Sequence, residues 1–130
     1  MTRKSILLVE DELLLCWIVE EALLDEGRRV TIATTGDTGL EALEGGERFD
    51  LLITNIRLRD GPDGWALARR ARELYPTLPV LYVTGDSAAQ HPAEGVAGSL
   101  ILGKPFEPEA LSAAIATLLE RPADLTPACS

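Results

Sequence analysis

Five short apolar runs, separated by segments with helical periodicity, constrain the fold of this chain more than any other feature. The runs as a set lack regular in-and-out alternation, which is typical of parallel strands covered by helices on both faces. Regular alternation of strand and helix with short connections predicts an open, doubly wound α/β fold with one five-stranded parallel sheet. The expected strands span residues 6–9, 29–33, 51–54, 80–83 and 99–102.

The segments between these runs carry helical patterns. Three helices are expected at 35–44, around 67–74 and from Pro108 onwards, where proline suits a first helical turn. The connection 86–98 differs, because a proline and a glycine fall where a helix interior would lie. We expect only one or two weakly anchored, mobile helical turns there. The first helix ends at a glycine, Gly27, and its core-facing stripe consists of Leu15, Ile18, Val19, Ala22 and Leu23.

Size and charge exclude several classes of protein. The 130 residues fit one domain, expected at 1–120 and followed by a flexible tail at 121–130. A formal net charge of −9 argues against nucleic-acid binding, which needs a basic face. No apolar stretch has membrane-spanning length, and the two cysteines show neither disulfide nor metal spacing. We therefore expect a cytoplasmic protein that binds neither membrane nor nucleic acid.

Polar residues stand at the carboxyl ends of four expected strands, where ligands bind in such sheets. Glu10 and Asp11 follow the first strand, Asn55 and Thr84 end the third and fourth, and Lys104 follows the fifth. Two adjacent carboxylates favour a hard divalent cation such as Mg²⁺. A lysine ammonium and a threonine hydroxyl suit phosphoryl oxygens. Together these residues predict a cation-and-phosphoryl site at one rim of the sheet.

Five motifs follow one another along the chain: Leu-Leu-Val-Glu-Asp-Glu at 7–12, Phe-Asp-Leu-Leu-Ile-Thr-Asn-Ile-Arg-Leu at 49–58, Asp-Gly-Trp at 63–65, Val-Thr-Gly at 83–85 and Lys-Pro-Phe at 104–106. In the order and spacing of these motifs, the chain resembles the response-regulator receiver domains of two-component and phosphorelay signalling over roughly residues 4–120. The resemblance implies a flavodoxin-like strand order of 2-1-3-4-5 and a signalling role without enzymatic activity. It also implies contact with a sensor histidine kinase or a histidine phosphotransferase, and with a downstream target protein.

The same resemblance implies roles for individual residues. Glu10 and Asp11 would hold Mg²⁺, with position 55 and the backbone carbonyl of Arg57 as further ligands. Thr84 and Lys104 would contact the phosphoryl group. The peptide bond between Lys104 and Pro105 would be cis, which is an uncommon conformation.

Asn55 departs from the family, which has a phosphate-accepting aspartate at this position. An amide cannot form an acyl phosphate, because its nitrogen is a poor leaving group and its oxygen carries no full charge. We therefore expect this form to remain unphosphorylated. We also expect weaker Mg²⁺ binding, since the site holds one negative charge fewer. Two origins stay open: a natural pseudo-receiver that signals by binding alone, or an engineered Asp-to-Asn substitution.

A second departure is Ile101, three residues before Lys104, where the family usually has an aromatic switch residue. Isoleucine has no ring to turn inward, so we expect any output to use another element. The segment 86–98 is the candidate, because weakly packed elements move most readily. Within it, His91 lies in a polar stretch and is expected to be solvated.

The first helix carries more apolar residues than its core-facing stripe needs. Leu13, Leu14, Trp17 and Leu24 lie off that stripe. A wider core-facing surface is the simpler interpretation. The alternative is a docking surface for a kinase or phosphotransfer helix, or for a second copy of the chain in a homodimer.

We interpret the chain as a stand-alone receiver domain that acts through protein–protein contact, because too few residues follow the last helix for an output domain. Two other functions fit the same sandwich less well. A small phosphatase with an aspartyl nucleophile needs an aspartate pair after the first strand, where this chain has Glu10 and Asp11. A flavin-binding module needs a Ser/Thr-rich phosphate loop at the same place.

Overall fold

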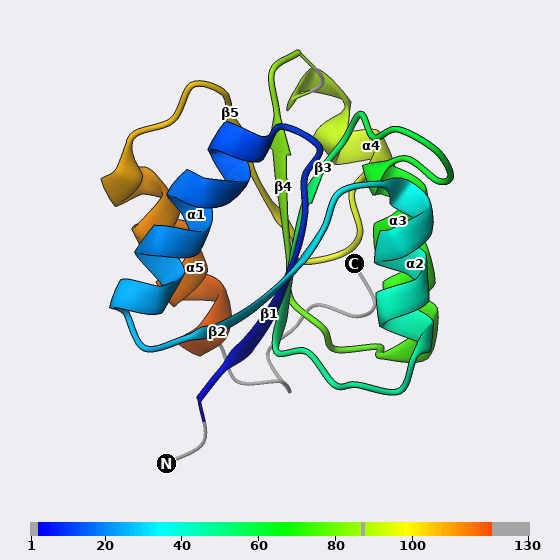
Figure 1. Ribbon diagram of the computed structural model, residues 1–130. Helices are drawn as coiled ribbons and strands as arrows, with labels where there is room; N and C mark the ends of the chain where they lie inside the picture. The colour runs from blue at the N-terminus through cyan, green and yellow to red at the C-terminus, as the bar shows by residue number, and fades with distance from the viewer. Residues whose placement is uncertain (1–2, 87, 121–130) are drawn as a thin grey trace.

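The computed structural model describes residues 3–86 and 88–120, which form a parallel sheet with helices on both faces (Figure 1). The order across the sheet is β2-β1-β3-β4-β5, and all neighbouring strands are parallel. The predicted fold class is therefore confirmed, whereas the expected tail at 121–130 lies outside the described residues. The strands are β1 (Ser5–Val9), β2 (Arg29–Ala33), β3 (Leu51–Asn55), β4 (Val80–Thr84) and β5 (Leu100–Gly103), each within one residue of its expected ends.

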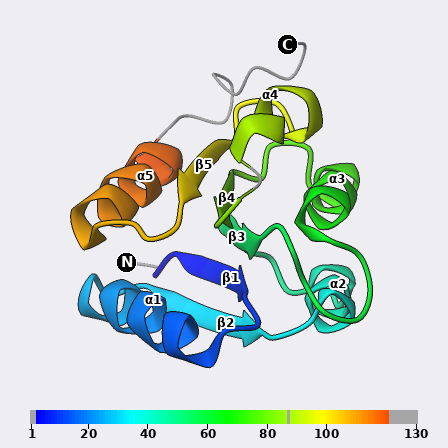
Figure 2. The same ribbon diagram turned by 90° about the horizontal axis from the view of Figure 1, so that it is seen from above.

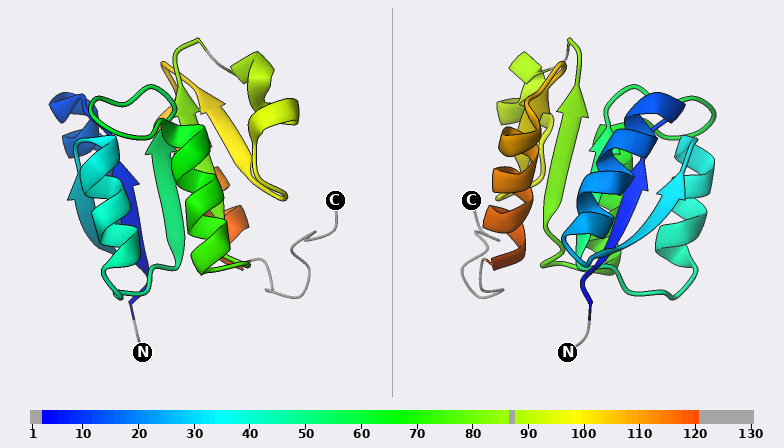
Figure 3. Two further views of the ribbon diagram at one scale, coloured as in Figure 1. Left: turned by 90° about the vertical axis from the view of Figure 1, so that its right-hand side faces the viewer. Right: turned by 60° about the vertical axis from the view of Figure 1, so that its left-hand side comes forward.

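The helices form two layers. Helices α1 and α5 cover one face of the sheet, and α2 and α3 cover the other (Figures 2 and 3). Two of them begin at side-chain caps: Thr35 accepts a hydrogen bond from the backbone N–H of Thr38, and Asp63 accepts one from Ala66. The helices are α1 (Leu13–Asp25), α2 (Gly36–Glu44), α3 (Gly64–Leu74), α4 (His91–Glu94) and α5 (Pro108–Glu120), with a short 3₁₀ turn η1 (Ala88–Gln90) before α4.

The sheet separates two apolar cores, which explains the unbroken apolar runs of the sequence. In β1, Leu7 and Val9 join the core under α2 and α3, while Ile6 and Leu8 join the core under α1 and α5. Every residue of the central strands β3 and β4 is buried. Strands covered on both faces have no solvent side on which polar residues could alternate.

Helix α1 buries a narrower stripe than predicted. Cys16, Val19 and Leu23 are buried, but Ile18, predicted to face the core, is 41% exposed. The expectation of a wider core-facing surface is also wrong, because α1 packs over β2 and the apolar residues off its core-facing stripe are exposed. The exposed large apolar residues of α1 are Leu13, Leu14, Trp17, Ile18 and Leu24.

The segment between β4 and β5 forms the short turns that were expected, but it is better anchored than predicted. Arg69 of α3 pairs with Glu94, and Arg72 donates a hydrogen bond to the carbonyl of Ala97. The backbone N–H of Val96 donates to the hydroxyl of Tyr82 on β4. Polar partners from the neighbouring elements thus replace the apolar stripe that this segment lacks.

None of the helices in the described chain is both long and apolar enough to cross a membrane.

Candidate functional site

The carboxyl ends of the strands open onto one cavity of about 480 Å³, referred to below as the site cavity. It gathers side chains that are far apart in the sequence, because parallel strands all end at the same edge of the sheet. Glu10 contacts this group through the side chains of Asn55 and Lys104. The lining residues are Asp11, Glu12, Asn55, Arg57, Thr84, Gly85, Asp86 and Lys104.

Asn55, the last residue of β3, lies at the centre of this group and is 8% exposed. Its amide nitrogen Nδ2 donates to the backbone carbonyl of Arg57 at 2.8 Å. The same nitrogen lies 3.4 Å from Oε2 of Glu10 and 3.5 Å from Oδ1 of Asp11. Asn55 therefore connects the loop after β1 to the loop after β3.

Lys104 reaches the acidic loop from the opposite side of the site cavity. Its ammonium lies 3.2 Å from Oε1 of Glu10 and 2.9 Å from Oε1 of Glu12. Burial raises the pKa of Glu10, against the backbone N–H of Glu12 and the charge of Lys104, which act to lower it. Burial acts to lower the pKa of Lys104, but its hydrogen bond to Glu12 and the charge of Glu10 outweigh this and raise that pKa. The ammonium is thus held charged between two carboxylates.

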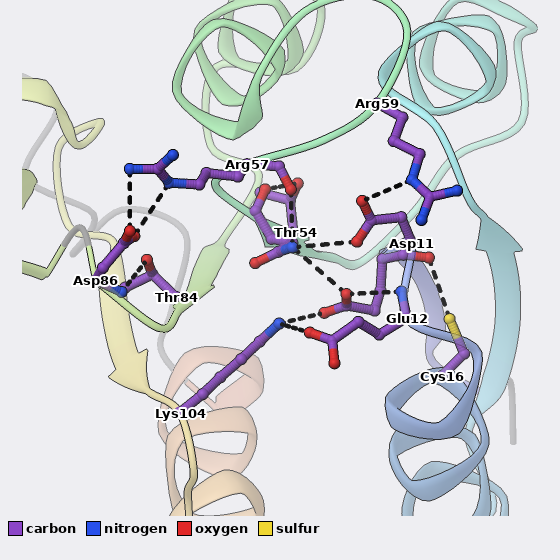
Figure 4. A network of polar contacts seen from close by, with 11 residues as sticks. Asp11, Glu12, Cys16, Thr54, Arg57, Arg59, Thr84, Asp86 and Lys104 are labelled. Atoms are coloured by element: carbon purple, nitrogen blue, oxygen red, sulfur yellow. Dashed lines mark hydrogen bonds and ion pairs between the residues drawn. The ribbon is translucent and has the colours of Figure 1, made fainter.

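Two arginines join the loops around the cavity, and the sequence did not reveal either contact. Arg57 pairs with Asp86 at 2.9 Å, and Arg59 lies 3.7 Å from Asp11 (Figure 4). The role of Glu12 as a partner of Lys104 was also missed, although it directly follows the two expected acids. Glu12 had a detectable signal, since it extends a run of carboxylates. The arginine pairings had none, because they depend on the path of the loop after β3.

That loop is held by the start of α2. Its residue Asp60 has a positive φ of 50°, and Gly61 follows at 111°. The carbonyls of Arg59 and Asp60 accept hydrogen bonds from the backbone N–H groups of Gly36 and Asp37 at 2.8 and 2.7 Å. These contacts fix the turn that carries Arg57 and Arg59 over the site cavity.

Close packing and one thiol fix the ends of β3 and β1. A Cβ at Gly64 would lie 2.2 Å from the carbonyl oxygen of Asn55, so the start of α3 approaches β3 as only glycine allows. The buried thiol of Cys16 donates to the carbonyl of Glu10 at 3.2 Å. The hydroxyl of Thr84 accepts from the backbone N–H of Asp86 at 3.2 Å, and the Lys104–Pro105 peptide bond is cis, as expected.

A ring cluster lies beside the site cavity, under α4. Tyr82 is fully buried, and its ring centroid lies 4.7 Å from that of Trp65 and 5.7 Å from that of His91. The expectation of a solvated His91 is wrong, because its Nε2 lies 2.8 Å from the hydroxyl of Ser99 and burial lowers its pKa. Ile101 pairs with Tyr82 in the sheet and packs against the same core. Position 101 therefore places an aliphatic side chain beside the ring of Tyr82.

The sequence matches the family described as the response regulator receiver domain over residues 6–116. The chain is 37% identical over 105 residues to the response regulator receiver protein CpdR of Brucella abortus (strain 2308), covering 79% of this chain and 86% of CpdR. It is also 33% identical over 87 residues to the DNA-binding transcriptional regulator NtrC of Proteus hauseri. That match covers 67% of this chain but only 18% of NtrC.

Solved structures agree with the match to the receiver-domain family. A response regulator receiver protein from Sinorhizobium medicae WSM419 superimposes with a TM-score of 0.87 and 39% identity, covering 90% of this chain and 94% of that one. A receiver domain of a Pseudomonas aeruginosa PAO1 sensor histidine kinase, described with magnesium in its active-site cleft, gives a TM-score of 0.80. The latter covers 92% of this chain and 100% of its own, at 24% identity, and supports the fold alone. Because the family match spans most of the chain and CpdR aligns over most of both lengths, the chain belongs to the response regulator receiver domain family.

Proposed function

We propose that this receiver domain works in a two-component or phosphorelay pathway through protein–protein contact, without accepting a phosphoryl group. One observation carries the proposal: an amide, Asn55, stands at the end of β3 inside a cavity also lined by Thr84 and Lys104. Phosphoryl transfer to a protein carboxylate needs a full negative charge on the attacking oxygen. The amide oxygen does not carry one. Either origin of Asn55, natural or engineered, leads to the same behaviour.

Three further carboxylates near the site cavity already have partners. Glu12 is bonded to Lys104, and Asp86 forms an ion pair with Arg57. Asp63, in the loop after β3, caps α3 through the backbone N–H of Ala66. These contacts argue against transfer of the phosphoryl group to one of these neighbouring acids instead.

Incubation with a small phosphodonor and Mg²⁺, followed by intact-mass measurement, tests this proposal. The unmodified chain is expected to gain no mass, whereas the Asn55→Asp variant is expected to gain one phosphoryl group. That pair of results would mean that the cavity is competent and lacks only its acceptor. A phosphoryl group on the unmodified chain would overturn the proposal.

The residues around Asn55 provide part of a magnesium site. The carboxylates of Glu10 and Asp11 and the carbonyl of Arg57 are the hard oxygen donors that Mg²⁺ prefers. Within residues 3–86 and 88–120, however, no three His, Cys, Asp or Glu side chains are grouped closely enough to hold a metal ion. An aspartate at position 55 would supply another carboxylate. We therefore propose that Mg²⁺ binds at Glu10, Asp11 and Arg57, weakened by Asn55.

The exposed side of α1 supports a protein partner. Leu14 and Trp17 are 69% and 58% exposed, in a helix that has no basic residue. The acids Glu21 and Asp25 on the same helix are exposed. Two copies of this acidic helix would repel each other, whereas a helix with apolar and basic residues would be attracted. We propose a histidine kinase or phosphotransferase helix as the occupant, in preference to a homodimer.

The remaining expectations stay predictions. Contact with a downstream target, the stand-alone mode of action and the cytoplasmic location all rest on the sequence. The alternatives of a small phosphatase or a flavin-binding module are not favoured, since the family match and the CpdR alignment both indicate a signalling module.

A further inference from the structure

The amide nitrogen of Asn55 lies where the oxygen donors of the proposed magnesium site converge. It contacts the carbonyl of Arg57 at 2.8 Å, Oε2 of Glu10 at 3.4 Å and Oδ1 of Asp11 at 3.5 Å. Glu10 and Asn55 are both buried, and Asn55 also lines the site cavity. The donor oxygens that would face a cation therefore face an N–H group of the chain itself.

The orientation of the amide follows from these neighbours. One N–H donates to the carbonyl of Arg57, and the other points between the carboxylates of Glu10 and Asp11, whose longer distances fit a shared hydrogen bond. The reversed amide would place its oxygen against three acceptors. Asn55 can therefore ligate a cation through its oxygen only by turning over and breaking all three contacts.

We propose that the Asn55 amide is an internal substitute for the divalent cation, and that it competes with Mg²⁺ for Glu10, Asp11 and the carbonyl of Arg57. Lys104 adds the positive charge that the amide lacks, because its ammonium lies 3.2 Å from Oε1, the other carboxylate oxygen of Glu10. The inference rests on the proposed function in placing the metal site at these residues. It goes further, because Asn55 would compete with Mg²⁺ for these oxygens. Loss of charge alone would make Asn55 only a poorer Mg²⁺ ligand than aspartate.

Calorimetric titration of Mg²⁺ into the unmodified chain and into Asn55→Ala separates these two roles. Both chains are neutral at position 55, so a pure charge effect predicts equal affinity. If the amide competes, its removal frees the three oxygens, and water can replace the lost amide ligand because Mg²⁺ keeps several waters. We expect Asn55→Ala to bind Mg²⁺ about tenfold more tightly than the unmodified chain, equivalent to about 1.4 kcal/mol. Equal or weaker binding by Asn55→Ala would overturn the inference.

A second measurement observes the Asn55 amide of the unmodified chain directly. In an NMR spectrum, the side-chain NH₂ of Asn55 should be protected from exchange. Its chemical shifts should also stay unchanged at Mg²⁺ concentrations that saturate Asn55→Asp. An Asn55 NH₂ that exchanges rapidly with solvent in the absence of metal would overturn the inference. Circular dichroism of Asn55→Ala and Asn55→Asp serves as the folding control.

The two hypotheses fail separately. A phosphoryl group on the unmodified chain would end the proposed function, but it would not bear on the relative affinities of the unmodified chain and Asn55→Ala. Equal affinities of those two chains would end the inference and leave the absence of phosphorylation untouched.

Discussion

The ammonium of Lys104 lies 3.2 Å from Oε1 of Glu10, joining the loop after β5 to the end of β1 across the site cavity. Glu10 is 2% exposed, so its carboxylate has little access to water. A buried charge is tolerated when it is paired and hydrogen-bonded. This ion pair therefore makes the stability of the domain depend on the same lysine that is expected to contact the phosphoryl group.

Removing the charge of Lys104 should expose that dependence. Lys104→Met keeps the apolar stem but leaves Glu10 without its ammonium partner. We expect a loss of about 2 to 3 kcal/mol in unfolding free energy at pH 7, because a single partner of a buried pair is removed. Urea unfolding measures the change. The raised pKa of Glu10 allows it to take up a proton, so the loss should shrink at acidic pH.

Glu12→Gln is the matched control, since Glu12 is the other partner of Lys104 but its side chain is 65% exposed. Its loss should cost less than about 1 kcal/mol. Similar losses in both variants would mean that burial of Glu10 does not determine the effect.

Metal-free Asn55→Asp should be less stable than the unmodified chain. The new carboxylate would lie close to Glu10 and Asp11, whose oxygens are 3.4 and 3.5 Å from Nδ2 of Asn55. We expect a loss of roughly 2 to 4 kcal/mol, from like charges at an effective dielectric near 20. Urea unfolding in the presence of a chelator measures it, and added Mg²⁺ should narrow the gap. A more stable aspartate form without metal would contradict this repulsion.

His91 should make stability fall in mild acid. Burial lowers its pKa in the folded protein from the ordinary 6.5. The unfolded chain therefore binds the proton more tightly, and the stability that neutral His91 contributes above pH 6.5 is lost as the pH falls through the folded value. The slope should not exceed about 1.4 kcal/mol per pH unit, the limit for one proton. Urea unfolding between about pH 7 and pH 5 measures this slope.

His91→Gln is the control for this slope, because the chain has one histidine. Glu10 changes stability in the opposite direction. Because its pKa is raised in the folded protein, protonated Glu10 contributes stability below pH 4.5, and this contribution is lost as the pH rises through the folded pKa. Subtracting the profile of the variant isolates the histidine. Parallel profiles for the two chains would contradict the assignment.

Trp17→Glu should leave the fold intact, because Trp17 is 58% exposed. We expect its unfolding free energy to stay within about 0.5 kcal/mol of the unmodified chain. Light scattering should find both chains monomeric, because in a dimer through α1 the acidic residues of the two helices would repel each other. A dimer of the unmodified chain that dissociates in Trp17→Glu would instead favour the homodimer.

Much of the fold could be predicted because its signals are local. Apolar runs without alternation indicate buried parallel strands, and the strand ends then follow within a residue. The exposure of Ile18 could not be predicted, because helical periodicity gives the direction of a stripe but not its width. That width is set by where α1 rests on the sheet.

Residue types and their spacing were enough to place Glu10, Asp11, Asn55, Thr84 and Lys104 at the carboxyl ends of strands in one parallel sheet, with an amide at position 55. The packing of the folded chain was needed to establish that this amide points its nitrogen at three oxygens, that Lys104 bridges Glu10 and Glu12, and that His91 contacts Ser99. The reason is physical. Residue type and spacing determine which elements form and where they end, whereas hydrogen bonds and ion pairs depend on distances between loops that only the packed sheet brings together.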